Sequence, residues 1–293
     1  MDSEFPMMDT AHLQAFGVFA RTLNFTATAK ALSLSQPAVF ERIQLLGARL
    51  GRSLYRREGR ALVLTADGER VARFARELED RWREFSGELS GVVEPEVVRL
   101  AAGEGSYLFV LGPALSTFRR ESKARLDLLT LGAKDTLGAV QRGEAHLGVA
   151  VIDLVPRGLE AEPLLTTPLC AALPARHPLA SKRTLTLADL RGERWVVTPD
   201  GQTHRELLTR ALGQQGAVVD APLEADGWPL MLKFVELGLG VAVVNGVCAK
   251  TPGVALRPLA ELGHVTYRLV TRRGARRPPQ ADRLAELLRR SGR

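Results

Sequence analysis

The pattern of apolar and polar positions changes character near residue 95 of this 293-residue chain. Before that point, apolar side chains recur at three- and four-residue spacing, which is typical of amphipathic helices. After it, short apolar runs alternate with helical patterns, which is typical of a parallel sheet covered by helices. The pattern therefore predicts a fold of the α + α/β class.

Residues 24–50 predict two helices joined by a tight turn. The first helix should start near Thr26, with Asn24 or Thr26 as its N-cap. Ser35 suits the N-cap of the second helix, because its hydroxyl can accept a hydrogen bond from an unpaired backbone N–H. Pro37 then falls in the first turn, where its missing N–H costs nothing. This is the helix-turn-helix pattern, whose second helix enters the major groove of DNA.

The flanking segments predict a winged version of this domain. Residues 12–23 form a preceding helix, and residues 54–64 alternate around Gly59, which predicts a hairpin with arginines at its tip. A long helix from 66 to about 92 follows, with Thr65 as its cap. We therefore expect three regions, which are a DNA-binding domain (8–65), a linker helix (66–94) and an effector-binding domain (95–293).

Positive charge is concentrated in the predicted winged region. Residues 21–64 hold eight basic and two acidic residues, a net charge of +6 against +7 for the whole chain. The eight are Arg21, Lys30, Arg42, Arg49, Arg52, Arg56, Arg57 and Arg60. Small-residue helix pairs also occur in proteins that bind no DNA, but contacts to phosphates require such a local excess of charge.

The C-terminal region predicts two α/β lobes. Lobe I should comprise about 97–165 and 271–293, and lobe II about 166–270, so that the chain crosses near Leu165 and returns near Thr271. Two connecting strands would form a hinge. Lobe II should include a strand over 217–223 and a helix over 229–239.

Such lobes bind ligands at the carboxyl ends of their strands, in the cleft between them. The candidates follow a predicted strand or start a helix at that edge, although ordinary capping or packing would also explain them. They are Gly103, Glu104, Ser106, Thr130, Thr203, His204, Asp226 and Trp228.

Other function classes find little support. The chain has no apolar run long enough for a membrane span, and its first residues lack the apolar core of a signal peptide. We therefore expect a cytoplasmic protein, with Met8 as a plausible native start. Cys170 and Cys248 lie in apolar stretches, which favours buried reduced thiols over a redox switch. The histidines do not cluster, and no catalytic triad, phosphate loop or metal set is recognisable, so we expect neither an enzyme nor a cofactor.

Several short motifs resemble the LysR-type transcriptional regulators, from Met8 to Arg290. The N-terminal ones are Phe25-Thr26-Ala27, Leu34-Ser35-Gln36-Pro37-Ala38, Leu50-Gly51, Leu54-Tyr55-x-Arg57 and Leu64-Thr65-x-x-Gly68. The C-terminal ones are Gly132, Gly143, His177-Pro178-Leu179 and Val235-x-x-Gly238-Leu239-Gly240. The resemblance implies a winged helix-turn-helix, a dimerising linker helix and a periplasmic-binding-protein-like effector domain. It also implies a tetramer on paired DNA sites, with a small-molecule effector and RNA polymerase as further partners.

Carried over by position, the resemblance implies that Ser35 caps the recognition helix and touches the DNA backbone. Gln36 and Pro37 would approach bases, whereas Arg57 and Arg60 of the wing would reach phosphates or the minor groove. The linker helix would dimerise through its apolar stripe, which consists of Val71, Phe74, Leu78, Trp82 and Phe85.

The chain departs from the family pattern at positions that read DNA. Phe40 and Glu41 stand where the family usually has Ser and a basic residue. Phe40 could contact a thymine methyl group or pack in the core, and Glu41 could accept from a cytosine amino group or pair with Arg42 or another neighbour. We favour an altered operator preference, with Arg42 among the DNA-contacting residues. In the cleft, Glu104 would repel an anion, so we expect a neutral or cationic effector.

The sequence bears on three alternatives to an effector-controlled regulator. An enzyme or secreted binding protein lacks the motifs described above, and an architectural DNA-binding protein has no need of two α/β lobes. The third alternative is a regulator whose pocket is vestigial and which is controlled by its amount or by a protein partner. The sequence leaves this alternative open, because glycines occupy positions 103 and 105.

Overall fold

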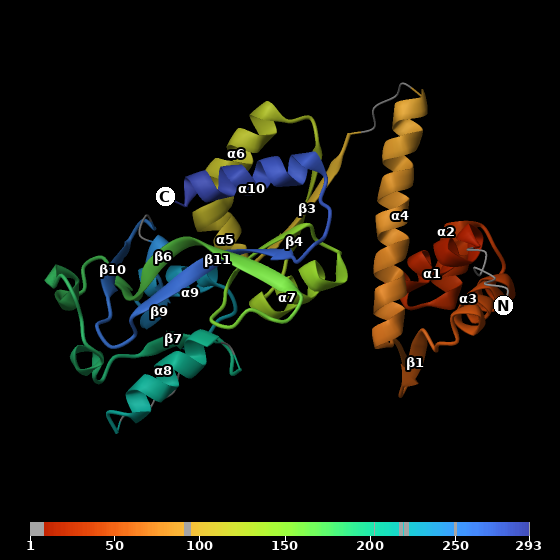
Figure 1. Cartoon of the computed structure of the whole chain (residues 1–293). Helices are drawn as coiled ribbons and strands as arrows, with labels where there is room; N and C mark the ends of the chain where they lie inside the picture. Colours follow the sequence, from red (N-terminus) through yellow and green to blue (C-terminus); the bar gives the residue numbers. More distant parts are fainter. Residues whose placement is uncertain are drawn as a thin grey trace. The chain divides into compact units, whose positions relative to one another are not determined.

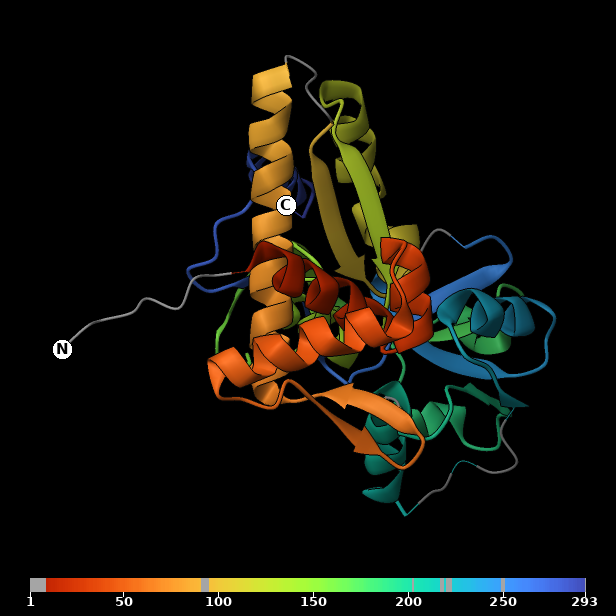
Figure 2. The same ribbon diagram turned by 90° about the vertical axis from the view of Figure 1, so that its right-hand side faces the viewer.

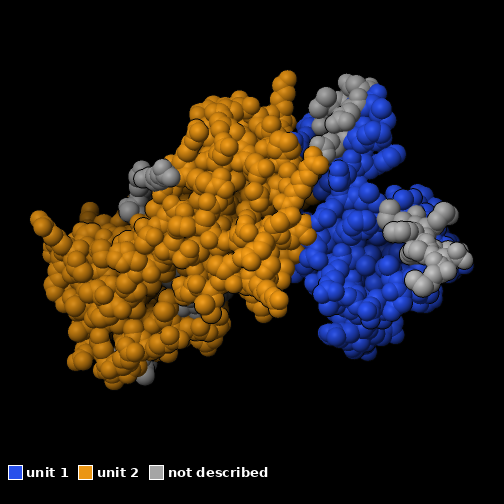
Figure 3. All heavy atoms as spheres, in the orientation of Figure 1, with its two compact units in different colours: residues 1–96, 142–144 blue, residues 97–141, 145–293 orange. Residues whose placement is uncertain are grey.

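The computed structural model describes residues 9–90, 95–201, 203–216, 219, 223–248 and 251–292 (Figure 1). The chain divides into two compact units, which are residues 1–96 with 142–144 and residues 97–141 with 145–293 (Figure 3). Our predictions for the first seven residues, for the end of the linker at 91–94 and for most of the strand at 217–223 lie outside the described residues.

The first unit is a winged helix-turn-helix followed by a long helix. Its elements are α1 (Thr10–Thr22), α2 (Phe25–Leu32), α3 (Gln36–Leu50), β1 (Tyr55–Glu58), β2 (Ala61–Leu64) and α4 (Ala66–Ser90). Asn24, rather than Thr26, caps α2 by accepting a hydrogen bond from the backbone N–H of Ala27 at 3.0 Å. Ser35 caps α3 in the predicted way, and Thr65 accepts from the backbone N–H of Gly68 at 3.0 Å.

A single hydrophobic core holds this unit together. Phe16 and Phe19 of α1 are fully buried against Ile43 of α3, and the small side chains of Ala72 and Ala75 bring α4 against them. Burial of this apolar surface from four helices fixes the orientation of α3 relative to the wing. Figure 2 shows the β1–β2 hairpin projecting from these helices.

The second unit contains most of the secondary structure. Its elements are β3 (Val97–Ala102), α5 (Glu104–Ser106), the π-helix η1 (Tyr107–Leu111), α6 (Gly112–Glu121), β4 (Arg125–Thr130), α7 (Ala133–Arg142), β5 (Leu147–Val151), β6 (Leu159–Pro174), the 3₁₀ helices η2 (Pro178–Ser181) and η3 (Leu187–Leu190), β7 (Trp195–Val197), α8 (Thr203–Gly213), β8 (Leu223–Glu224), α9 (Trp228–Glu236), β9 (Val241–Asn245), the 3₁₀ helix η4 (Gly246–Cys248), β10 (Val254–Pro258), β11 (His264–Arg272) and α10 (Pro279–Ser291). The predicted helix at 229–239 therefore ends early, and β10 was not predicted.

The strands form one sheet in the order β4-β3-β5-β11-β6-β9-β7-β8, with β10 paired to β6. In lobe I, alternate residues of β3 face opposite layers. Leu100 packs in the core formed with α6 and α10, whereas Ala101 packs with α7 (Figure 1). In lobe II, Val197 of β7 packs with α8 and Val196 packs with α9. Each lobe is thus a sheet covered on both faces, as the strand and helix alternation predicted.

Two antiparallel strands, β6 and β11, connect the lobes. β6 is long enough to pair with β11 in lobe I and with β9 in lobe II. β11 pairs with β5 from Tyr267 onwards, a few residues before the return that we predicted near Thr271. The pairing of β11 with β6 has a register shift between Tyr267 and Arg268, close to this point.

A buried hydrogen bond links these connecting elements. The side-chain amide of Asn245, at the end of β9, donates to the hydroxyl oxygen of Tyr267 on β11 at 2.8 Å. Both side chains are buried, and burial raises the pKa of the Tyr267 hydroxyl well above its usual value. The bond therefore ties the edge of lobe II to the strand that returns to lobe I.

Candidate DNA-binding surface and effector cleft

The exposed face of α3 contains the residues predicted to read DNA. Gln36, Pro37, Phe40 and Glu41 are exposed at helical spacing, while Val39 between them is fully buried. The hydroxyl of Thr26 donates to Oε1 of Gln36 at 3.2 Å, which orients the amide. The helix therefore presents a polar edge at its N-terminal end, where recognition helices contact bases.

Phe40 is partly packed within its unit and partly exposed. Its ring lies 5.5 Å from the ring of Phe25, yet 47% of the residue remains exposed. Glu41 is exposed and makes no ion pair with any described residue, and its chain neighbour Arg42 likewise has no acidic partner there. Both Phe40 and Glu41 are thus available to a partner surface.

Gln44 is a further candidate that we did not predict. It lies one helical turn after Phe40 on the same exposed face, and its Nε2 donates to the hydroxyl of Tyr55 at 2.8 Å. Tyr55 begins the wing, so this bond joins the recognition helix to the hairpin. The spacing of four residues from Phe40 was the available signal.

The wing arginines differ in their partners. Arg56 pairs with Glu58 on the same strand, whereas Arg57 and Arg60 are exposed and have no ion pair within the described ranges. Gly59 turns the hairpin with a φ of +61°, a conformation that favours glycine. Three of the other basic residues that precede the wing pair with acids, and these pairs are Arg21–Glu79, Arg49–Asp9 and Arg52–Asp67. Arg57 and Arg60 are therefore the wing's unneutralised cations.

The apolar stripe of α4 divides into two sets. Val71 and Leu78 are partly buried against the core of their own unit. Phe74, Trp82 and Phe85 are exposed, Trp82 at 67%. The reason is that α4 also contributes to the core of the winged domain, so one side of its apolar stripe faces that core.

In the second unit, the structure brings several predicted cleft residues together. The ring of Trp228, at the start of α9, packs so closely on Gly105 that a Cβ there would lie 2.3 Å from its Cε3 atom. A Cβ on Gly227 would lie 2.8 Å from Oε2 of Glu104. Trp228 also packs against the cores of both lobes. This contact therefore joins the two lobes at the start of α9.

The remaining predicted cleft residues are more scattered. Thr130 is exposed beside the Gly103 turn, because β4 and β3 are parallel and Thr130 is in register with Ala102. Ser106 is buried, and Asp226 is exposed just before α9. The backbones of Thr203 and His204 begin α8, but their side chains lie outside the described residues.

The two cysteines are buried thiols. Burial raises the pKa of the Cys170 thiol to about 11 and that of Cys248 to about 12, so both are protonated at neutral pH. No group of three or more potential metal-ligating side chains occurs within the described ranges. In the part of the chain that the structure describes, no helix combines the length and the apolar character needed to cross a membrane.

Comparison with known families accounts for both units. Residues 10–69 match the model described as "Bacterial regulatory helix-turn-helix protein, lysR family". Residues 93–293 match the model described as "LysR substrate binding domain". Together the two models cover almost the whole chain.

Individual relatives are regulators of the same kind. A RuBisCO operon transcriptional regulator from Allochromatium vinosum is 27% identical over 236 residues, which cover 80% of this chain and 78% of the relative. The Hca operon transcriptional activator HcaR of Escherichia coli (strain K12) is 25% identical over 285 residues, which cover 95% of this chain and 96% of the relative.

Solved structures share the fold. A full-length OxyR variant from Pseudomonas aeruginosa superposes with a TM-score of 0.71 at 18% identity, covering 97% of this chain and 94% of that one. Full-length CbnR in complex with its target DNA has a TM-score of 0.56 at 22% identity, covering 98% of this chain and 100% of that one.

Proposed function

This chain belongs to the LysR family of bacterial transcriptional regulators, and we propose that it reads its operator with α3 and the wing and responds to an effector bound between its two lobes. It is a DNA-binding regulator with an effector-binding domain, and the families and relatives that it matches are regulators rather than enzymes. The observation that carries the proposal is the exposed edge of α3 beside unneutralised wing arginines.

Within this proposal, the residues divide into two roles. Gln36, oriented by Thr26, reads a base edge, and Phe40 and Glu41 set an operator preference that differs from that of relatives with Ser and a basic residue there. Arg57 and Arg60 contact phosphates and add affinity that does not depend on sequence. Ser35 caps α3 and positions it on the DNA backbone.

Control by the effector would act through the hinge. The lobes are joined by β6 and β11 and meet where Trp228 packs on Gly105, so a ligand that favours one arrangement shifts the equilibrium between lobe positions. We propose that this shift changes subunit spacing, DNA bending and contact with RNA polymerase.

Assembly is a further part of the proposal. The exposed rings of Phe74, Trp82 and Phe85 on α4 support pairing of two subunits along this helix. Large apolar side chains that are exposed together on one element often mark a protein–protein interface. The effector domains would then pair into a dimer of dimers, which acts in the cytoplasm on chromosomal DNA.

The test is footprinting on the region upstream of the protein's own gene at two salt concentrations. We expect a salt-sensitive footprint with two separated half-sites. Gln36→Ala should lose about 1–3 kcal/mol of binding free energy on the wild-type operator. The loss should be small on an operator in which the base pair contacted by Gln36 is already mutated. Uniform coating of the DNA, or an equal loss for Gln36→Ala on every sequence, would contradict the proposed reading role.

A further inference from the structure

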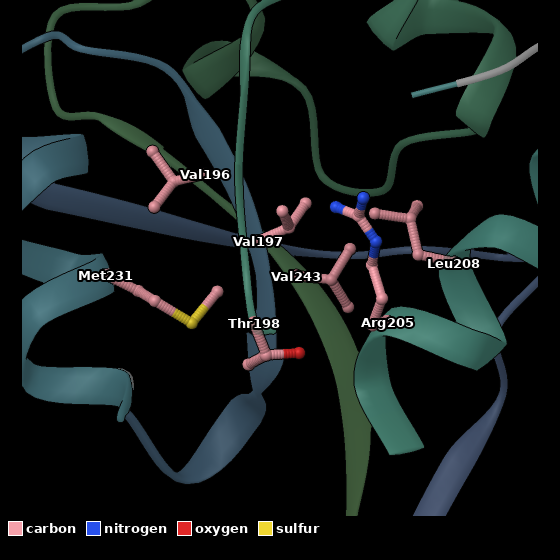
Figure 4. A pocket seen from close by; sticks show the side chains of 7 residues that line it. All are labelled: Val196, Val197, Thr198, Arg205, Leu208, Met231 and Val243. Atoms are coloured by element: carbon pink, nitrogen blue, oxygen red, sulfur yellow. The ribbon is translucent and has the colours of Figure 1, made fainter. Parts of the chain in front are cut away.

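Polar side-chain atoms that no described residue pairs with occur in both units. In lobe II, the Thr198 hydroxyl and Nη1 of Arg205 are such atoms, and both residues line a void at the carboxyl end of β7 (Figure 4). This void has room for about one water molecule, so no organic ligand fits there. In the first unit, Oε1 of Gln44 is such an atom, and Gln44 is exposed on the face of α3 that contains the residues predicted to read DNA.

Gln44 lies in the middle of this face. An α-helix turns by about 100° per residue, which places Phe40 at about 40° and Glu41 at about 140° around the axis from Gln36. Gln44 lies at about 80°, between these two residues. It is also about 12 Å further along the axis than Gln36, a distance that spans several base pairs, so the two glutamines would contact different ones.

A hydrogen bond to the wing holds the side chain of Gln44. Its Nε2 donates to the hydroxyl of Tyr55 at 2.8 Å. The ring of Tyr55 packs edge-on against Phe19 and Phe25, with ring centroids 5.3 and 5.6 Å apart. Phe19 is fully buried, so the hydroxyl is anchored on the core of the unit. The amide is therefore oriented before DNA binds, which lowers the entropy lost on binding.

The atoms left over on this amide match one base. A glutamine amide has one carbonyl oxygen and two N–H donors. Tyr55 engages one N–H of Gln44, which leaves Oε1 and the second N–H for a partner. In the major groove, adenine alone presents both a donor and an acceptor, at N6 and N7. In Gln36, by contrast, Oε1 accepts from Thr26, so its two donors suit a base edge with acceptors only.

We propose that Gln44, oriented by Tyr55, reads an adenine in the major groove and is a specificity-determining residue; this inference rests on the DNA-reading function proposed above. A different role for the same hydrogen bond is to brace the wing against α3, because Tyr55 begins β1 and Arg57 follows two residues later. A base contact acts at one base pair. A brace acts on the phosphate contacts of the wing, and therefore on every sequence.

The experiment substitutes each base pair of one footprinted half-site in turn and measures the affinity of the full-length protein by fluorescence anisotropy. We expect one A·T pair whose replacement by G·C weakens the wild type by about 5- to 150-fold and Gln44→Ala only slightly. On the unmodified site, Gln44→Ala should lose affinity to the same extent. Gln14→Ala is the matched control, because Gln14 is an exposed glutamine on α1, and its sensitivity to each substitution should equal that of the wild type.

A modified base tests the contact atom by atom. Replacing the adenine of that pair by 7-deazaadenine removes the N7 acceptor and keeps the Watson–Crick pairing. The wild type should bind the modified site more weakly, because the N–H of Gln44 loses its acceptor. Gln44→Ala should bind the modified and unmodified sites equally, and an equal loss for both proteins would overturn the proposal.

Tyr55→Phe separates orientation of the amide from bracing of the wing. It removes the hydroxyl and keeps the ring that packs against Phe19 and Phe25. Discrimination at the same A·T pair should fall, whereas discrimination at other pairs, affinity for a scrambled duplex and the salt slope should stay the same. Gln44→Ala should also keep the slope, because Gln44 carries no charge. A flatter slope with equal losses on the specific and scrambled duplexes would show a brace and overturn the proposal.

Two further results would overturn it as well. The first is a Gln44→Ala protein that is sensitive to the same base pairs as the wild type. The second is a loss of discrimination at a G·C pair. In both cases the sequence-specific footprint of the wild type shows that the proposed regulatory function stands. A wild type without such a footprint would overturn that function and this inference together.

Discussion

Removing the charge of Arg60 should flatten the salt dependence of DNA binding. Arg60 is exposed at the tip of the wing and has no ion pair among the described residues, so it is available to neutralise a phosphate. Each neutralised phosphate contributes about 0.9 to the slope of log K against log salt concentration. Arg60→Ala should therefore reduce the slope by about 0.9 per bound subunit, and by about 1.8 for two subunits on a pair of half-sites.

Between 50 and 200 mM salt, a slope change of 0.9 corresponds to about a 3.5-fold smaller loss of affinity per subunit. The assay is fluorescence anisotropy of a labelled duplex over this range, with the footprinted site and a scrambled sequence side by side. The effect should be equal on the two duplexes, because a phosphate contact carries no sequence information.

The wing offers a matched control. The double substitution Arg56→Ala with Glu58→Ala removes one exposed ion pair and leaves the net charge of the wing unchanged. Its slope should equal that of the wild type, and Arg60→Lys should restore most of the slope lost in Arg60→Ala. An unchanged slope for Arg60→Ala, or an effect confined to the footprinted site, would refute the reasoning.

Two further predictions concern the effector domain. Gly105→Ala places a Cβ 2.3 Å from the ring of Trp228, so the ring must move. We expect a change in tryptophan fluorescence. The free energy of unfolding, measured by chemical denaturation, should fall by about 1–3 kcal/mol. Gly132→Ala, at a site with open space, should cause neither, and an unshifted spectrum for Gly105→Ala would contradict the packing. Because burial raises their pKa values to about 11 and 12, Cys170 and Cys248 should resist a thiol reagent at pH 8 in the native protein and both react in denaturant; rapid native labelling of either would disagree.

Much of the first unit could be predicted because its signals are local. Ser35 and Thr65 cap helices through bonds to backbone groups three residues away, and Gly59 supplies a backbone conformation that the hairpin turn requires. The exposed face of α3 follows from helical periodicity alone. The family resemblance then added DNA contact and effector control to this local picture.

The sequence was less informative where a contact joins residues far apart in the chain. The return of the chain near Thr266 depends on how β11 pairs with β5 and β6, which no short window of sequence specifies. In the sequence, Val71 and Leu78 do not differ from the other apolar residues of α4. In the structure, they pack against the core of the winged domain.

The sequence by itself determined the order of most helices and strands, the N-cap of the recognition helix, the charge of the wing and the resemblance to the family. Only the tertiary structure decided that Trp228 occupies the space beside Gly105, and that the Thr198 hydroxyl and Nη1 of Arg205 are buried without a hydrogen-bond partner among the described residues. The physical reason is that propensities and caps act over a few residues, whereas burial and hydrogen-bond satisfaction depend on every segment that packs around a side chain.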